Sequence, residues 1–176
     1  FIKEYDPKFI IPRGLGRSYG DAAQIKENFV INMRFAKKIS LSKNQATVGA
    51  GVSFAELLEY IVPKGYFLPV SPGSSKVTIG GAIAADVHGK NHHNDGSLGN
   101  FIKSILILDA NGDIKELKPT SFDGKFNDFF WATVGGMGLT GLILEATISL
   151  IKIETSFMKV KTFICEDLAS LMDLML

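Results

Sequence analysis

All the histidines of the chain lie in one short segment, residues 88–93, together with Lys90. This segment follows a glycine-rich run at 77–82 and precedes Gly96 and Gly99. Glycine lets the backbone approach a ligand closely, and imidazole and ammonium groups can hydrogen-bond the polar atoms of that ligand. The combination predicts a binding site for a phosphate-bearing or heteroaromatic ligand.

A second glycine-rich segment runs from Arg13 to Asp21 and contains Gly14, Gly16 and Gly20. Consecutive backbone N–H groups with little side-chain cover, flanked by arginines, suit a pyrophosphate. The spacing lacks the Gly-Lys-Ser/Thr of a Walker loop and does not match the Rossmann fingerprint, which excludes those two sites. Glycine loops also serve as ordinary turns between strands, so the segment on its own leaves both interpretations open.

Other chemistries find little support in the residue pattern. Imidazole binds zinc, copper or iron, but His92 and His93 are adjacent, and on a strand adjacent side chains point to opposite faces. We therefore expect no metal site. The chain has no Gly-x-Ser-x-Gly elbow, which argues against a serine hydrolase. The separate carboxylates of Asp86, Asp95 and Glu145 are expected to be structural or solvated and are assigned no catalysis.

Composition predicts a globular protein without nucleic-acid partners. The chain has 176 residues, 46% hydrophobic and 21% charged, which is enough for one compact domain or two small subdomains. The 19 basic and 18 acidic residues nearly balance and form no basic block. Cys165 is the only cysteine, so no disulfide can form within the chain. No apolar run approaches the roughly 18 residues of a membrane span, and no signal-peptide pattern is present.

The first part of the chain reads as mixed α and β structure. Ser53 and Glu56 form a capping box that begins a helix, and Pro63 with Gly65 ends it. A strand is expected to deliver the first glycine loop. The predicted strands cover residues 8–12, 28–32 and 46–52.

The second part begins after a turn-rich linker, with a boundary near Val70. Asn111-Gly112 favours a hairpin, because both residues tolerate positive φ. A cluster of Phe126, Phe129, Phe130 and Trp131 is expected to pack in the core. The predicted elements are the hairpin strands at 102–108 and 114–117, an aromatic helix at 127–133, a long strand at 142–153 and an amphipathic segment at 166–174.

Five motifs in order resemble the flavoprotein family of vanillyl-alcohol oxidase and p-cresol methylhydroxylase (PCMH). They are Arg13–Asp21, Pro72–Ser74, Val77–Ala84, His88–His93 and Trp131–Gly141. The resemblance implies an α+β fold, the two-subdomain FAD-binding domain of PCMH type. The subdomains would span 1–70 and 71–153, and residues 154–176 would begin a truncated substrate domain. Since the chain does not start with Met and stops inside an amphipathic segment, we expect it to be part of a longer protein.

The resemblance also implies FAD as the cofactor. Some members of the family attach the flavin to a histidine of the first glycine loop, where this chain has Ser18 and Tyr19, so noncovalent FAD is expected. His88 and Lys90 would face the flavin ring as the catalytic residues, because we expect a strand to end against the ring just after Gly80 and Gly81. Ile143 would close on the adenine or ribose end. The full set of implied cofactor contacts is Arg13, Gly14, Leu15, Gly16, Arg17, Ser18, Tyr19, Gly20, Asp21, Pro72, Gly73, Ser74, Thr78, Ile79, Gly80, Gly81, Ala84, Ala85, Asp86, His88, Gly89 and Ile143.

The implied activity is oxidation of a sugar alcohol carbon by hydride transfer to flavin N5, with C2 of a polyprenyl-phosphate-linked pentose as the expected substrate. The alternatives are an alditol or aldonolactone oxidase of the same family, or a noncatalytic nucleotide-binding module whose glycine loops serve only packing. The expected partners are a small-molecule or lipid-linked sugar and a reductase that completes an epimerisation. The expected location is cytoplasmic, with membrane association through a lipid-linked substrate.

Overall fold

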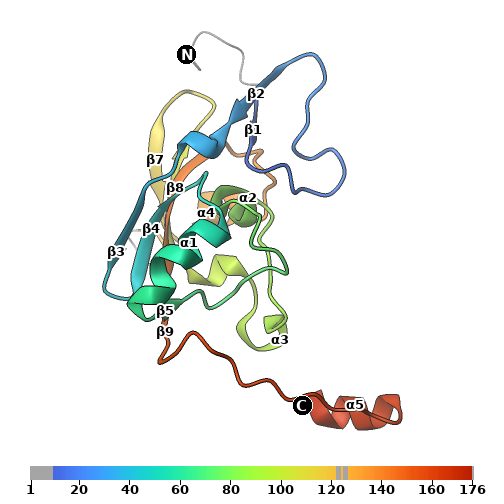
Figure 1. The fold of residues 1–176 in the computed structure, drawn as a ribbon. Helices are drawn as coiled ribbons and strands as arrows, with labels where there is room; N and C mark the ends of the chain where they lie inside the picture. Colours follow the sequence, from blue (N-terminus) through green and yellow to red (C-terminus); the bar gives the residue numbers. More distant parts are fainter. Residues whose placement is uncertain (1–9, 122–123, 125–126, 176) are drawn as a thin grey trace.

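A five-stranded antiparallel sheet forms the centre of the fold in the computed structural model, which describes residues 10–121, 124 and 127–175. The sheet has the order β3-β4-β8-β6-β7, and the two hairpins β3-β4 and β6-β7 flank the central strand β8 (Figure 1). Its strands are β3 Ile39–Ser42, β4 Gln45–Gly49, β6 Ile102–Leu108, β7 Ile114–Leu117 and β8 Leu142–Ser149.

Two smaller sheets lie beside it. β1 (Ile10–Arg13) and β2 (Phe29–Asn32) pair in parallel, so the glycine loop that follows β1 must return to start β2 at the same end as β1. β5 (Tyr66–Phe67) pairs antiparallel with β9 (Ile151–Lys152).

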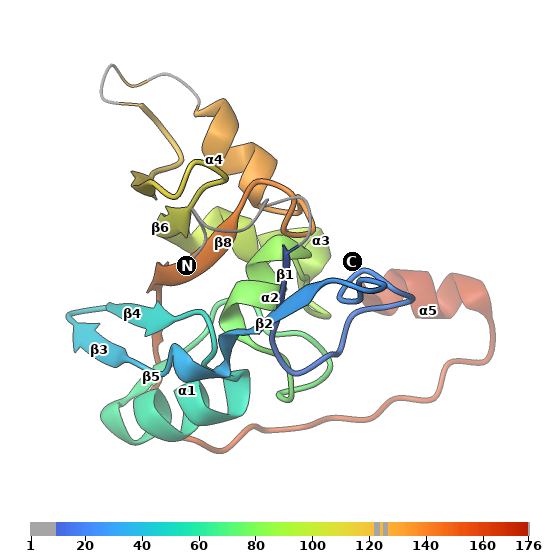
Figure 2. The ribbon, with the colours of Figure 1, turned by 90° about the horizontal axis from the view of Figure 1, so that it is seen from above.

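One side of the sheet is covered by α1 and α2 (Figures 1 and 2). α2 contacts β4 and β8, and its side chains Ile79, Ala82 and Ile83 are buried in the core. Gly80 allows this approach, because a methyl group added to it would lie 2.8 Å from the Cβ of Ala50. The α-helices are α1 Phe54–Ile61, α2 Ile79–Ala84, α3 His92–Asp95, α4 Asp128–Thr133 and α5 Leu168–Met175, and the 3-10 turns are η3 Met33–Phe35, η4 Val62–Lys64 and η5 Leu98–Phe101.

The predicted capping box is confirmed at the start of α1. The Ser53 hydroxyl accepts a hydrogen bond from the Glu56 N–H at 3.2 Å, and the Glu56 carboxylate accepts one from the Ser53 N–H at 2.7 Å. Lys37 also donates to both carboxylate oxygens of Glu56, at 2.6 Å each. The Lys37 and Ser53 donors favour the ionised carboxylate and lower the pKa of Glu56 from 4.5 to about 2.

The predicted hairpin between β6 and β7 is confirmed, but its turn is longer than the Asn111-Gly112 pair. Gly112 has φ +80, whereas Asn111 does not adopt a positive φ. The turn runs over 109–113 and is organised by Asp109, whose carboxylate accepts from the N–H groups of Asn111 and Asp113 and from Lys115 Nζ at 2.6 Å. These donors lower the pKa of Asp109.

Three other element predictions need correction. Gly80 and Gly81 lie inside α2, so the segment before the histidines is a helix and no strand ends there. His92 and His93 begin the short helix α3, so the argument that a strand would turn them to opposite faces was wrong. The long strand expected over 142–153 is interrupted at Leu150 between β8 and β9.

The aromatic cluster packs as predicted where it is described. α4 forms at the expected place, its Phe130 is fully buried, and Phe129 and Trp131 pack against the core. Phe126 lies outside the described residues. The division expected at Val70 remains a prediction, and β4 from before that point pairs with β8 from after it in a single sheet.

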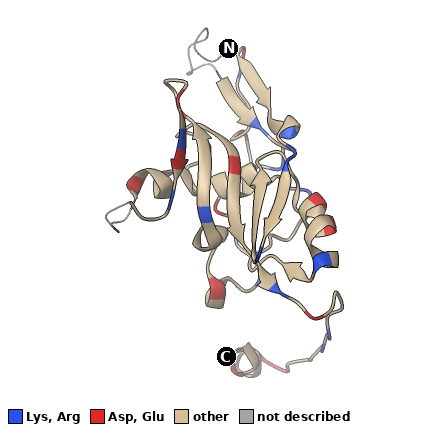
Figure 3. Cartoon of the chain, turned by 90° about the vertical axis from the view of Figure 1, so that its left-hand side faces the viewer, with Lys and Arg blue, Asp and Glu red and all other residues tan. Residues whose placement is uncertain are grey.

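The segment from residue 153 to α5 leaves the body of the domain (Figure 2). It carries exposed apolar side chains, among them Phe157 and Ile164. Among the helices of the described residues, none is both long and apolar enough to cross a bilayer. Acidic and basic residues are scattered over the strands and helices in the view of Figure 3.

Candidate cofactor site

The first glycine loop is packed against the start of α2. A methyl group added to Gly14 would overlap the Thr78 hydroxyl and would lie 2.8 Å from Thr78 Cγ2. Thr78 is the N-cap of α2 and is buried, so the loop backbone rests directly on the helix start. The first glycine loop and the start of α2, two segments that only the family resemblance assigned to one site, are therefore in contact.

The loop conformation depends on glycine at two positions. Gly16 has φ +63 and Gly20 has φ +58, a backbone region that side chains other than glycine rarely adopt. The guanidinium of Arg13 folds over Gly16, with Nη2 2.7 Å from where its Cβ would be. Arg17, Ser18 and the 97% exposed Tyr19 face solvent, so this loop presents its backbone together with cationic and hydroxyl groups.

The first N–H groups of α2 already have partners inside the protein. Ile79 N–H donates to Val52 O at 2.8 Å, Gly80 N–H donates to Ala50 O at 2.9 Å, and Gly81 N–H donates weakly to the Thr78 hydroxyl at 3.4 Å. The helix start therefore has few donors left for an anion. A ligand could instead lie along the outer face of α2, which has little side-chain cover because the exposed Gly81 and Ala85 lie one turn apart.

A third glycine segment, residues 134–141, closes on the other end of α2. Gly135 N–H donates to Ile83 O at 3.0 Å and Met137 N–H donates to Ala84 O at 2.8 Å. A methyl group on Gly138 would lie 3.6 Å from Pro12 of β1. This segment therefore links α2 to the strand that carries the first glycine loop.

The buried hydroxyl of Thr140 in this third segment lacks a hydrogen-bond partner within the described part of the chain. A buried polar atom without a partner costs free energy, and a bound ligand is one way in which such an atom is satisfied. No cofactor contact was predicted in this segment, although its repeated glycines were a signal and Trp131–Gly141 was one of the five family motifs.

The predicted residues 72–74 precede α2 on the same side as the first loop (Figure 1). A Cβ on Gly73 would meet no heavy atom within 4 Å, so its surface is open to a ligand. The Ser74 hydroxyl accepts from the Lys76 N–H at 3.2 Å and stabilises the turn. Pro72 is half-buried.

The predicted catalytic pair lies beyond α2, and both His88 and Lys90 are exposed. Between them, Gly89 is buried, and a methyl group there would lie 2.9 Å from Ser71 O. The segment that carries His88 is thereby held against the residues that precede α2.

Asp86 has a structural task in this arrangement. Its carboxylate accepts from Ser97 Oγ at 2.7 Å and from Gly99 N–H at 2.9 Å, and its φ of +41 makes the bend after α2. These bonds fix the strand-like bridge between His88 and Ser97. Asp86 was predicted to contact the cofactor. Because both of its carboxylate oxygens already accept hydrogen bonds within the protein, such a contact would use other atoms of the residue.

Two of the predicted contact residues are core residues. The side chain of Ile79 is fully buried, and that of Ile143, in β8, is 6% exposed. Because both belong to the hydrophobic core, any contact of theirs with a cofactor would be through main-chain atoms. Leu15 and Ala84 are half-buried, and Asp21 is exposed.

The histidines form a cluster of rings. The ring centroids of His88 and His92 are 4.8 Å apart, and those of His92 and His93 are 5.8 Å apart. Among the residues that the structure describes, no three His, Cys, Asp or Glu side chains are arranged to hold a metal ion.

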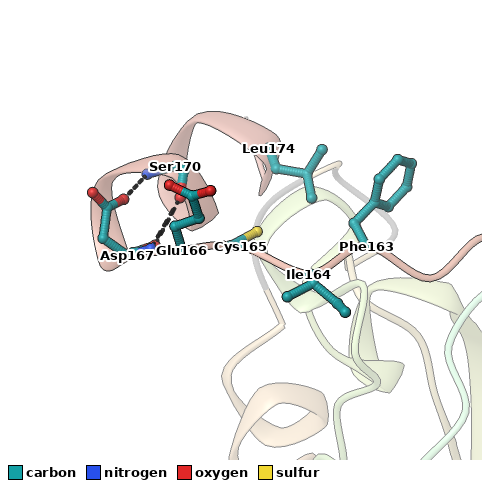
Figure 4. Close-up of a pocket in the computed structure, with 7 residues that line it drawn as sticks. All are labelled: Phe163, Ile164, Cys165, Glu166, Asp167, Ser170 and Leu174. Atoms are coloured by element: carbon teal, nitrogen blue, oxygen red, sulfur yellow. Dashed lines mark hydrogen bonds between the residues drawn. The ribbon is translucent and has the colours of Figure 1, made fainter.

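A pocket of about 300 Å³ lies elsewhere, on the C-terminal segment (Figure 4). It is formed between α5 and the extended chain before it, and it contains none of the predicted site residues. Its lining is Phe163, Ile164, Cys165, Glu166, Asp167, Ser170 and Leu174. Asp167 caps α5 through the Ser170 N–H at 2.8 Å, which lowers the pKa of its carboxyl.

The comparison with protein families is consistent with this mixed α/β fold and its antiparallel sheet. The sequence model described as FAD binding domain matches residues 3–118 of this chain. The chain belongs to this FAD-binding family of oxidoreductases, as the motifs predicted.

Individual proteins similar to this chain are also oxidoreductases by name. The chain is 48% identical over 151 residues to decaprenylphosphoryl-beta-D-ribose oxidase of Mycolicibacterium smegmatis, an alignment that covers 84% of this chain and 32% of the relative. It is 31% identical over 143 residues to L-gulonolactone oxidase of Bos taurus, covering 78% and 31%. It is 28% identical over 148 residues to glycolate oxidase subunit GlcD of Bacillus subtilis, covering 81% and 32%. The chain spans about a third of the length of these relatives.

Proposed function

We propose that this chain is the FAD-binding part of an oxidoreductase that oxidises an alcohol carbon of a polyprenyl-phosphate-linked pentose, at C2, with FAD held noncovalently. The observation that carries the proposal is the contact of two glycine segments, 13–21 and 134–141, with opposite ends of α2. Close-packed backbone with open faces suits a long, flat nucleotide cofactor.

The residues present fit FAD on two structural grounds. A side chain at Gly16 or Gly20 would need a strained backbone, and Gly73 and Gly20 have open space where a Cβ would be. The Thr140 hydroxyl is buried without a partner. In this proposal the loop 13–21 holds the pyrophosphate, the face of Gly81 and Ala85 lies along the ring system, and main-chain atoms near Ile143 meet the adenine or ribose end.

Bound FAD would supply the hydride acceptor. The chain's own residues would orient the substrate at the end of α2, where His88 and Lys90 are exposed. His88 would hydrogen-bond the flavin or the substrate hydroxyl, and Lys90 would offer a cation to a phosphate or hydroxyl of the substrate. The division into subdomains at 1–70 and 71–153, with the cofactor extended between them, is part of the same proposal.

The proposed substrate class is supported by the likeness, at 48% identity, to a relative whose name states a decaprenylphosphoryl ribose. A lipid-linked substrate would bring a cytoplasmic enzyme to the membrane surface, and a partner reductase would complete an epimerisation. A second candidate, an aldonolactone or alditol oxidase, is favoured by the likeness to L-gulonolactone oxidase at 31% identity.

The test is the visible spectrum of the full-length protein, followed by acid precipitation. We expect the absorption bands of oxidised flavin, and we expect the yellow colour to stay in the supernatant after the protein is precipitated. Flavin retained in the pellet would contradict noncovalent binding. A colourless protein that does not take up added FAD would instead support a noncatalytic module whose glycine segments only pack. Reduction of the flavin by a lipid-linked ribose, compared with reduction by a free polyol or an aldonolactone, separates the two enzyme candidates.

A further inference from the structure

Two histidines share one backbone carbonyl at the exposed end of the site. The Nδ1 atoms of His88 and His92 are each 3.2 Å from the oxygen of Gly89. A carbonyl oxygen can only accept, and it has two lone pairs, so both rings must donate through Nδ1–H. In the neutral state each ring then has an unprotonated Nε2, which can accept a hydrogen bond.

The shared carbonyl is held firmly in place. A methyl group on the buried Gly89 would lie 2.5 Å from Asn91 Oδ1 and 2.9 Å from Ser71 O, so this backbone has little room to move. Asn91 itself donates to Pro69 O at 2.9 Å and to the Asp95 carboxylate at 2.7 Å. These bonds tie the start of α3 to the segment before α2.

The ring of His92 also limits the rotation of the His88 side chain. Their centroids are 4.8 Å apart with planes tilted by 58°. Rotation of His88 away from Gly89 would break both the hydrogen bond and this ring contact. His93 touches His92 edge-on at 5.8 Å between centroids, and no ring contact joins it to His88 in the described part of the chain.

We propose that His92 is a positioning residue for His88. It holds the imidazole of His88 on the Gly89 carbonyl in the Nδ1–H form, so that Nε2 of His88 is presented as the acceptor for a hydroxyl hydrogen of the substrate. This inference rests on the proposed function for the identity of the ligand, an alcohol that is to be oxidised. The arrangement of the two rings does not depend on it.

The first readout is the tautomer of His88 in the full-length protein labelled with ¹⁵N-histidine, read by long-range ¹H–¹⁵N correlation and assigned with His88→Gln. We expect His88 to be protonated on Nδ1 alone at a pH where the ring is neutral. His92→Ala should give a mixture of tautomers, because the ring becomes able to leave Gly89. His92→Phe, which keeps a ring in place, should restore the single tautomer. His93→Ala is the matched control and should leave the spectrum of His88 unchanged.

The second readout is the reduction of the flavin by substrate in the same proteins. We expect His92→Ala to slow reduction about tenfold, with flavin content unchanged, because a misplaced acceptor costs rate. His92→Phe should recover most of that loss. A single Nδ1–H tautomer and a parental rate in His92→Ala would overturn the inference. A parental protein without flavin would overturn the proposed function and with it the substrate role of His88, whereas the tautomer spectra alone decide the arrangement of the rings.

Discussion

The backbone of Gly14 lies directly against the side chain of Thr78, so the first glycine loop packs against the N-cap of α2. The contact explains why a residue as small as glycine is needed at position 14, where the backbone does not have a positive φ. It also couples the conformation of the loop to the start of the helix, and this coupling can be measured.

Gly14→Ala should weaken FAD binding, because the added methyl group overlaps the Thr78 hydroxyl and must displace the loop. Thr78→Gly in the same chain should recover part of the affinity, since glycine is tolerated at an N-cap at a cost of a few tenths of a kcal/mol. A double-mutant cycle on FAD affinity, by titration of the apoprotein, should give a coupling of about 1 kcal/mol. Additive effects would show that the two residues do not constrain each other.

Arg17→Ala should weaken FAD binding by about 1.5–3 kcal/mol, the range for a hydrogen bond to a charged group. Arg17 is exposed beside Gly16, in the loop proposed to hold the pyrophosphate. Gly16→Val should weaken binding as well, since φ at this position is +63 and Arg13 occupies the space of a side chain. Lys103→Ala, an exposed charge in β6, is the control and should bind as the parent does. Parental affinity in both loop variants would mean that the loop is only a turn.

Glu56→Ala should lower the free energy of unfolding by about 1 kcal/mol, the size of a lost helix cap, because alanine has no oxygen to accept from the Ser53 N–H. The ion pair to Lys37 adds little at this partly exposed position. The folded pKa of about 2 lies below the ordinary 4.5, so this stabilisation is complete above pH 4.5 and is lost as the pH falls toward 2. Denaturant unfolding of parent and variant should therefore differ at neutral pH and converge in acid. Glu59→Ala, at an exposed position on the same helix, is the control. A difference that stays constant with pH would show that Glu56 acts by packing.

The sequence was a good guide to local structure where the signal was local. The capping box at Ser53 and the β6-β7 hairpin follow from residues a few positions apart, and both formed. Gly80 and Gly81 were misjudged because two glycines lower helix propensity, whereas here tertiary packing against Ala50 decides. His92 and His93 were misjudged at a site where the deciding bond is local, since the N–H of Asp95 donates to Asn91 O and makes a helical turn.

The residues that make up the site were harder to predict from the sequence than the local structure was. The first loop and the histidine segment stood out through their residue types. The approach of residues 134–141 to α2 could not be predicted, because it depends on main-chain bonds such as that from Met137 to Ala84 O. The structural task of Asp86 was also hidden, since its partners Ser97 and Gly99 lie in a later segment.

Thr140→Val should have opposite effects on the apoprotein and on FAD binding. Removing a buried hydroxyl without a partner should stabilise the apoprotein by up to about 1 kcal/mol, because valine has nearly the same shape and needs no hydrogen bond. If the hydroxyl is satisfied by the cofactor, the same change should weaken FAD binding by a similar amount. Thermal unfolding with and without FAD measures both. A variant that is more stable and binds FAD as the parent does would place this hydroxyl away from the cofactor.

His88→Ala and Lys90→Ala should each slow reduction of the flavin by substrate in the full-length enzyme, while the flavin stays bound. The reason is their place at the exposed end of the site: His88 is fixed on the Gly89 carbonyl, and the Lys90 ammonium has no ion-pair partner within the described residues. Losing the acceptor should lower the limiting rate by about a hundredfold, the low end for a residue that handles a proton. Losing the cation should instead raise the substrate concentration needed for half the limiting rate. Anaerobic stopped flow over a range of substrate concentrations separates the two effects, with Lys76→Ala as a control. Parental rates and parental concentration dependence in both variants would show that the substrate approaches the flavin from elsewhere.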